Sequence, residues 1–256
     1  MDDDQSTPPR LTRLTFHGPL SEARATRIID RLAGTAPPGT VLDIGCGWGA
    51  FMLRLLEAVP GATGIGIDLN AEDTARGRAD AERRGLAGRV AFVEESGVGT
   101  RLGPADLVVC LGAGHALTDQ SPPDHIRAAL DAIRGLVTPH GRVLFGEGFW
   151  EHPPPPERLA TMWPDATADE LPDLAGLVDL AVAAGFRPSW IETASAAEWE
   201  DFESGYQSDV EDWLAAHPGH QLAEETRTRL DAHRATWLRG YRGHLGMAYL
   251  TLTPVL

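Results

Sequence analysis

The chain has 256 residues, 43% of them hydrophobic, and a formal net charge of −15. It contains no lysine, so its basic residues are arginines and histidines. This composition supports a folded domain with a real core and excludes wholesale disorder. No apolar run approaches the roughly 20 residues that cross a membrane, and the acidity is unlike the basic surface of nucleic-acid-binding proteins. We therefore expect neither a membrane nor a nucleic-acid partner, and the sequence leaves the oligomeric state open.

The N-terminal stretch 1–15 begins acidic and proline-containing, without the basic-then-apolar order of a signal peptide. We expect it to be a disordered leader to a folded domain over 16–256. Cys46 and Cys110 are the only cysteines, too few for a disulfide framework. The cytoplasm is the expected compartment.

Helical and strand patterns alternate along most of the chain. In chain order, amphipathic periodicity predicts helices, and short apolar runs predict strands, as follows: helix 21–32, strand 40–44, helix 51–59, strand 64–68, helix 71–84, strands 90–93 and 105–110, helix 126–137, strand 142–146, helix 171–182, and strands 189–193 and 247–252. The alternation indicates an α/β fold of Rossmann-like type. We expect a seven-stranded, mostly parallel sheet with helices on both faces.

The rhythm breaks between the last two strands. About 45 residues there, roughly 195–240, carry apolar side chains at helical spacing. Such an insertion is too long for a plain loop and needs structure of its own. We expect a helical cap over the ligand-binding edge of the sheet.

The turn after the first strand carries the chemistry. It reads Asp43-Ile44-Gly45-Cys46-Gly47-Trp48-Gly49, and Asp68 ends the next strand. In an open parallel sheet, ligands bind beyond the carboxyl ends of the strands, where the strand order reverses. The glycines permit a sharp turn and close approach of a ligand, and a carboxylate at Asp68 can accept hydrogen bonds from both hydroxyls of a ribose.

These features leave more than one cofactor open. Gly45, Gly47 and Ala50 also satisfy the looser dinucleotide pattern Gly-x-Gly-x-x-Gly/Ala. Asp43 discriminates between the readings, because a carboxylate beside the glycines repels a pyrophosphate and attracts an ammonium group. S-adenosylmethionine (SAM) has an ammonium group and no phosphate, so we favour it over a nicotinamide dinucleotide.

The segment 41–49 resembles motif I of class I SAM-dependent methyltransferases, and Gly66-Ile67-Asp68 resembles their second motif. The segments 105–110 and 139–144 are similar to their fourth motif and to the entry into their fifth strand. The downstream stretches 146–150, 199–203 and 239–242 resemble a narrower group of largely uncharacterised bacterial methyltransferase-like proteins.

The resemblance implies a SAM site and names its residues. Asp43 and the loop Gly45-Cys46-Gly47 would hold the amino-acid end of SAM, and Asp68 the ribose. The remaining contacts would come from Leu69 on the adenine, from Leu111 and Gly112 beside the methionine portion, and from Glu95, Ser96 and Gly97 at the adenine edge. The family commonly has an acidic residue where Ser96 stands here, so the side chain that binds the adenine amine is left open.

Candidates for catalysis and acceptor binding follow the fourth and fifth strands and lie in the cap. His115 is the preferred general base, because an imidazole needs little pKa tuning. The acceptor candidates are His17, Glu147, Trp150, Tyr206, Trp213 and Tyr241. Each also has a structural reading, as a loop histidine, an ion pair or ordinary aromatic packing.

We interpret the chain as a methyltransferase that moves a methyl group from SAM to an O, N or S atom of a small-molecule acceptor, leaving S-adenosylhomocysteine (SAH). No metal is expected, because the fourth strand ends without a carboxylate cluster. The alternatives are other SAM chemistry on the same fold, such as a cyclisation, a SAM-binding protein without turnover, and a nicotinamide-dependent oxidoreductase.

Overall fold

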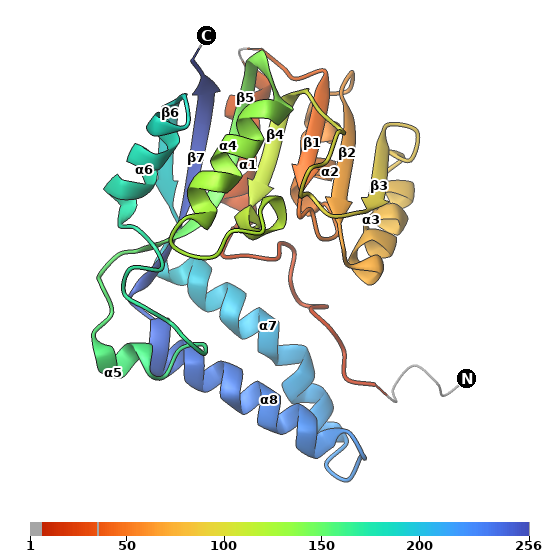
Figure 1. Cartoon of the computed structure of the whole chain (residues 1–256). Coiled ribbons are helices and arrows are strands. Elements are labelled where there is room, and N and C mark those ends of the chain that lie inside the picture. The colour runs from red at the N-terminus through yellow and green to blue at the C-terminus, as the bar shows by residue number, and fades with distance from the viewer. Residues whose placement is uncertain (1–6, 35, 256) are drawn as a thin grey trace.

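The computed structural model describes residues 7–34 and 36–255, and its centre is a seven-stranded sheet in the order β3-β2-β1-β4-β5-β7-β6 (Figure 1). The strands are β1 (Thr40–Ile44), β2 (Thr63–Asp68), β3 (Val90–Glu94), β4 (Ala105–Leu111), β5 (Val137–Trp150), β6 (Phe186–Thr193) and β7 (Leu245–Pro254). Only β7 runs antiparallel to its two neighbours, β5 and β6. The predicted seven-stranded, mostly parallel sheet is confirmed.

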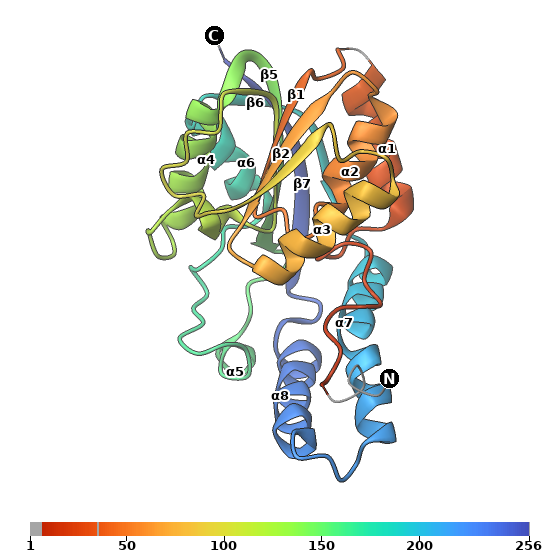
Figure 2. The ribbon, with the colours of Figure 1, turned by 90° about the vertical axis from the view of Figure 1, so that its right-hand side faces the viewer.

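Helices cover both faces of the sheet (Figure 2). One face carries α1 (Glu22–Gly34), α2 (Ala50–Ala58) and α3 (Ala71–Arg83), and the other carries α4 (His125–Leu136) and α6 (Leu174–Ala183). Each layer has its own buried apolar cluster against the sheet. Burial on both faces explains why the central strand β4 reads as a continuous apolar run.

The fifth strand is longer than the sequence predicts. A turn was expected at 139–141, but β5 already begins at Val137 and pairs there with Ala105. The register then shifts, so that Leu107 pairs with Arg142. The expected turn is therefore an irregularity inside β5, and Gly141 fits it because a Cβ would lie 2.8 Å from the carbonyl oxygen of Asp106.

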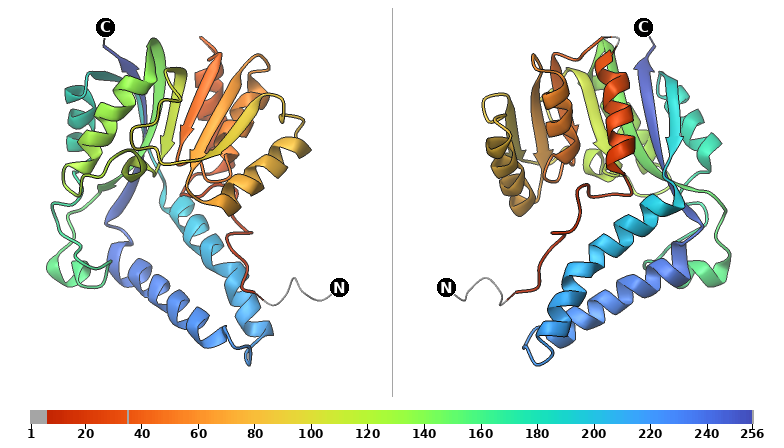
Figure 3. Two further views of the ribbon diagram at one scale, coloured as in Figure 1. Left: turned by 45° about the vertical axis from the view of Figure 1, so that its right-hand side comes forward. Right: turned by 180° about the vertical axis from the view of Figure 1, so that it is seen from behind.

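The expected insertion before the last strand is a helical hairpin that projects beyond the carboxyl edge of the parallel strands (Figure 3). It consists of α7 (Ala196–Ala216), α8 (Ala223–Ala235) and the π-helical turn η2 (Thr236–Tyr241). A capping box starts α7: Ser195 is the N-cap, and its backbone N–H donates a hydrogen bond to the Glu198 carboxylate. The far end has a small core of its own around Trp213 and Leu230. The other end of the hairpin packs near the sheet, where Tyr241 of η2 contacts Trp150 at the end of β5.

The expected leader divides into two parts. Residues 1–6 lie outside the described residues. Residues 7–15 pack along α7 and α3, with Leu11 and Leu14 buried, where disorder was expected. Thr12 donates two hydrogen bonds to Asp209 of α7, which explains the order, because the partner lies 197 positions away in the sequence.

Two shorter helices complete the chain: η1 (Gly114–Leu117), directly after β4, and α5 (Pro156–Leu159), after the proline run. In the part of the chain that the structure describes, no helix combines the length and apolarity needed to span a membrane.

Candidate functional site

A cavity of about 610 Å³ opens at the carboxyl ends of β1, β2 and β4, where the strand order reverses. Every residue predicted to bind the cofactor lines it: Asp43, Gly45, Cys46, Gly47, Asp68, Leu69, Glu95, Ser96, Gly97, Leu111 and Gly112. His17 and His115 line the same cavity. The structure thus brings these residues together, and their individual roles remain predictions.

The floor of the cavity contains glycines at positions where a Cβ would clash with a neighbouring loop. Gly45 has a φ of 60°, and a Cβ there would lie 2.3 Å from the Cβ of Ala113. A Cβ at Gly97 would lie 2.6 Å from the carbonyl oxygen of Ala116. These glycines let the loops after β1, β3 and β4 close against one another. Gly47, with a φ of 54°, instead faces open space.

Asp43 is a buried acid that has no partner among the residues that the structure describes. It is only 4% exposed, and burial, helped by the nearby carboxylate of Asp68, raises its pKa to about 8. None of the described residues lowers that pKa through a hydrogen bond or a positive charge. A buried carboxyl group in this state favours a ligand that brings a cation.

Asp68 is held at the rim of the cavity by the backbone. Its carboxylate accepts hydrogen bonds from the N–H groups of Gly47 and Asn70, both at 2.8 Å. The next side chain, Leu69, is 74% exposed and borders the cavity. The Asp68 carboxylate is suited to bind the hydroxyls of a ribose, and the exposed Leu69 side chain next to it is suited to pack on a purine.

These observations test whether SAM fits. A ligand with an ammonium group at one end, a ribose in the middle and a flat base at the other would meet Asp43, Asp68 and Leu69 in turn. A pyrophosphate in the same loop would face the carboxylates of Asp43 and Asp68. The residues present therefore fit SAM better than a dinucleotide.

The adenine edge has two polar side chains that are both engaged locally. The carboxylate of Glu95 accepts a hydrogen bond from the Thr100 hydroxyl at 2.9 Å, and the Ser96 hydroxyl accepts one from the backbone of Val98 at 3.2 Å. Both residues line the cavity. Both Glu95 and Ser96 therefore remain candidates to bind the adenine amine.

The segment 10–20 forms one wall of the cavity. Arg10 donates to both carboxylate oxygens of Asp73, at 2.6 and 3.1 Å, and the Trp48 indole donates to the carbonyl oxygen of Thr15 at 2.8 Å. His17 stacks on Trp48 with ring centres 5.5 Å apart, and partial desolvation lowers the pKa of His17. The wall is therefore pinned to the loop after β1 and to α3.

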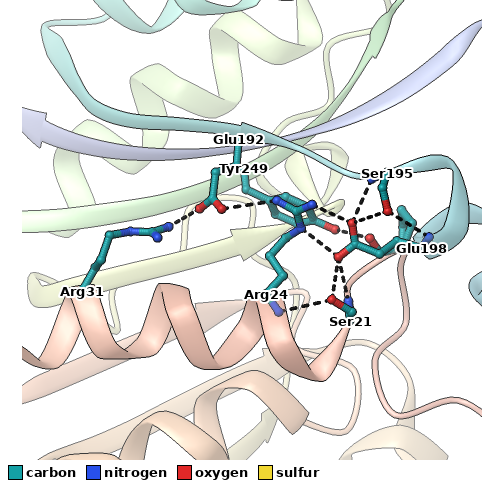
Figure 4. A network of polar contacts seen from close by, with 8 residues as sticks. Ser21, Arg24, Arg31, Glu192, Ser195, Glu198 and Tyr249 are labelled. Carbon is teal, nitrogen blue, oxygen red and sulfur yellow. Dashed lines mark hydrogen bonds and ion pairs between the residues drawn. The ribbon is translucent and has the colours of Figure 1, made fainter.

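The start of α7 is fixed to α1 by a network around Glu198 (Figure 4). The carboxylate of Glu198 accepts bonds from Arg24 at 2.7 and 2.8 Å, from Ser21 and from Ser195. Although burial opposes its ionisation, these hydrogen bonds outweigh burial and hold the pKa of Glu198 well below its ordinary value. One turn further along α7, Phe202 lines the cavity. The network thus positions a cavity wall.

Several acceptor candidates lie outside this cavity. Tyr206 stacks on His233 with ring centres 4.3 Å apart, and Trp213 packs between the hairpin helices. Tyr241 donates a hydrogen bond to the buried Glu203 and borders a separate cavity of about 350 Å³. Tyr206 also packs against Leu11 and Leu14 of the N-terminal segment. Tyr241 belongs to an aromatic cluster with Trp150 and Trp163. All three side chains therefore have packing partners and lie outside the cavity lining.

The two acceptor candidates of β5 are also absent from the lining. Trp150 is 2% exposed and stacks on Trp163, with ring centres 6.2 Å apart. Glu147 lies beside η1, where a Cβ on Gly114 would be 2.4 Å from its Oε2. Burial raises the pKa of Glu147 to about 7, against a hydrogen bond from the Gly148 backbone. Glu147 thus stands next to the cavity rather than in it.

Comparisons with known proteins bear on the fold and the family. Residues 42–143 match the family model described as a methyltransferase domain. The chain is 26% identical over 217 residues to the uncharacterized protein YjhP of Escherichia coli, covering 84% of each chain. The resemblance to class I methyltransferases is confirmed.

Two solved structures share the methyltransferase fold over nearly the whole chain. A SAM-dependent methyltransferase from Thiobacillus denitrificans, in complex with SAH, has a TM-score of 0.80 and 25% identity, covering 96% of this chain and 98% of that one. A SAM-dependent methyltransferase from Geobacter sulfurreducens, also with SAH, has a TM-score of 0.81 and 24% identity, covering 97% and 99%. The similarity extends through the hairpin, which supports the narrower bacterial grouping together with YjhP.

Sequence reasoning missed part of the wall around this cavity. Phe16, Phe202, Met247 and Tyr249 line it but were not candidates. Phe202 lies in the segment 199–203, whose resemblance to the narrower group gave a signal without a role. The others carry no motif, because their positions depend on the antiparallel strand β7 and on the packed segment 10–20.

Proposed function

We propose that the protein is a SAM-dependent methyltransferase that acts on a small-molecule acceptor. The observation that carries the proposal is the unpartnered, buried carboxyl group of Asp43 beside a glycine floor and Asp68, within one cavity. The two SAH complexes with the same fold support the same cofactor.

The chain's own residues would divide the work of binding. Asp43 would hold the ammonium group, and ionise as it does so, while Asp68 would accept hydrogen bonds from the ribose hydroxyls. Leu69 would cover the base. The wall formed by the segment 10–20 and Phe202 would exclude water and align the two reactants, which is the main requirement of an in-line displacement.

SAM supplies an electrophilic methyl group on a sulfonium. His115 lies on η1, directly after β4, and its side chain is exposed to the cavity. In the proposed role, its imidazole accepts the proton that an O, N or S acceptor loses on methylation. An acceptor that already arrives deprotonated would not need His115.

The test is a radiolabelled or mass-detected methyl transfer assay with SAM and a library of small acceptors. The proposal expects SAH to accumulate only when an acceptor is present, in step with a methylated product. A SAM-derived product formed without any acceptor would instead indicate cyclisation or another non-methylating reaction. SAH binding without turnover on any acceptor would indicate a binding protein.

A further inference from the structure

The cavity that would hold the two reactants is strongly acidic. Its lining contains five acidic side chains: Asp43, Asp68, Asp73, Glu95 and Asp119. Arg10 is the one arginine among the described residues that line it. The lining therefore carries several more negative than permanent positive charges.

The arginine is not free to bind an anion. Arg10 donates to both oxygens of Asp73, at 2.6 and 3.1 Å, and Asp73 is only 4% exposed. In this bidentate pair the guanidinium of Arg10 already uses the two N–H donors with which it would bind the carboxylate or phosphate of a ligand. The remaining basic side chains of the lining are the imidazoles of His17 and His115, and desolvation favours the neutral form of His17.

The lining also has an apolar part. Phe16, Leu20, Phe202, Met247 and Tyr249 line the cavity together. The Tyr249 hydroxyl is already used, because it donates a hydrogen bond to the carbonyl oxygen of Pro19 at 2.9 Å. This side of the cavity offers contact area to an aromatic or alkyl body and little to a charged one.

We infer that the acceptor is a neutral or positively charged compound with an aromatic or alkyl body, and that carboxylated and phosphorylated compounds are excluded. The inference rests on the proposed function, because SAM would occupy the part of the cavity beside Asp43 and Asp68. SAM brings one net positive charge, and the lining still holds an excess of carboxylates after that charge is counted. An anionic acceptor would lie in the field of these acidic side chains, of which Asp119 has no role with the cofactor and no pairing with Arg10. It would find no free arginine among the described lining residues to pair with.

The experiment compares three compounds of the same body: benzylamine, benzyl alcohol and benzoate. Each is titrated into the full-length protein saturated with SAH, and binding is followed by ligand-observed NMR. We expect the amine and the alcohol to bind at least about tenfold more tightly than benzoate, because the acidic lining repels the benzoate carboxylate. Benzoate binding as tight as the amine, or no binding by any of the three at millimolar concentration, would overturn the inference.

A variant and a matched control locate the charge. Asp119 lines the cavity and has no assigned role with the cofactor. Asp119→Asn should narrow the ratio between amine and benzoate affinities by about threefold, whereas Asp179→Asn, an exposed change on α6, should leave it unchanged. An unchanged ratio of amine to benzoate affinity in Asp119→Asn would count against the inference.

The failure of the proposed function and the failure of the inference can be told apart. If the protein fails to bind SAH at all, the proposed function fails, and the inference fails with it. If SAH binds and benzoate binds equally well, only the inference fails.

Discussion

The two sides of the cavity are built in different ways. The cofactor side consists of loops that follow β1, β2, β3 and β4, and each contributes a short contiguous set of residues such as Gly45 to Gly47. The opposite side is assembled from the segment 10–20, the start of α7 and strand β7. Its members lie far apart in the sequence: Pro19 and Tyr249, which share a hydrogen bond, are separated by 230 positions.

Because the two sides differ, we expect substitutions on them to have different effects on ligand binding and on stability. On the cofactor side Gly45 and Gly97 leave no room for a Cβ, and Asp43 has no partner among the described residues. On the opposite side the walls are joined by polar networks such as that of Glu198 (Figure 4). We therefore expect changes on the cofactor side to act on binding directly, and changes on the opposite side to act through stability and position.

Asp43→Asn should have the largest effect on cofactor affinity. It removes the charge that would pair with the ammonium group, and we expect SAH affinity to fall about 100-fold or more. The control is Asp30→Asn, the same change at an exposed position of α1. Calorimetry measures both, and SAH affinity within about threefold of wild type in Asp43→Asn would contradict the role of the carboxylate.

The same variant should stabilise the unliganded fold at alkaline pH. The pKa of Asp43 is about 8 in the folded protein, against roughly 3.9 when unfolded. Ionisation therefore disfavours folding increasingly as the pH rises from about 4 to about 8, and this penalty is absent below that window. Urea unfolding near pH 8.5 should show Asp43→Asn more stable than wild type by roughly 2–5 kcal/mol, with little difference near pH 4. A less stable variant at alkaline pH would contradict the buried, unpaired state of Asp43.

Glu198→Gln should have an intermediate effect. It leaves the buried guanidinium of Arg24 without its closest carboxylate, so we expect a loss of roughly 3 kcal/mol in the free energy of unfolding at neutral pH. SAH affinity should fall by about fivefold, because the segment 16–20 and Phe202 lose their fixed position. The neighbouring Glu200→Gln breaks only an exposed pair with Arg242 and should change stability by less than about 0.5 kcal/mol. Equal effects of the two substitutions in urea unfolding would contradict the account.

His115→Ala should hardly affect cofactor binding. If the imidazole acts as the general base, turnover with an acceptor should fall by about 100-fold or more while SAH affinity stays within about threefold. His140→Ala, on the exposed irregular part of β5, should leave both unchanged. Parallel losses of turnover and SAH affinity in His115→Ala, or no loss, would remove the residue from its role.

Trp213→Ala should have the smallest effect on the cavity. The side chain is 6% exposed in the core of the helical hairpin, so its loss should cost roughly 3 kcal/mol of stability or more. SAH affinity of the folded protein should stay unchanged, since the residue does not line the cavity. A large loss of affinity with little loss of stability would instead return Trp213 to the acceptor site.

The sequence predicts the fold and the cofactor side well for a common reason. Strands such as 40–44 and turns such as 45–49 are determined by local pattern, and the carboxyl ends of parallel strands meet by topology. Residues on neighbouring strands, Asp43 and Asp68 among them, therefore converge without any knowledge of distant contacts.

The opposite side could not be predicted in the same way. Helical periodicity predicts the insertion, but it does not predict the direction in which the hairpin projects. The acceptor candidates Tyr206 and Trp213 lie outside the cavity lining. The order of residues 7–15 depends on Asp209 and Asp73, far away in the sequence. Contacts of this kind leave no periodic signal in the sequence.

The most direct test of the central claim is a calorimetric titration of the purified protein with SAM, SAH and NADH, repeated on Asp68→Ala. The account predicts that SAM and SAH bind with micromolar dissociation constants, that both are lost or strongly weakened in the variant, and that NADH does not bind. Binding of NADH in place of the adenosyl ligands, or the same SAH affinity in Asp68→Ala, would contradict it.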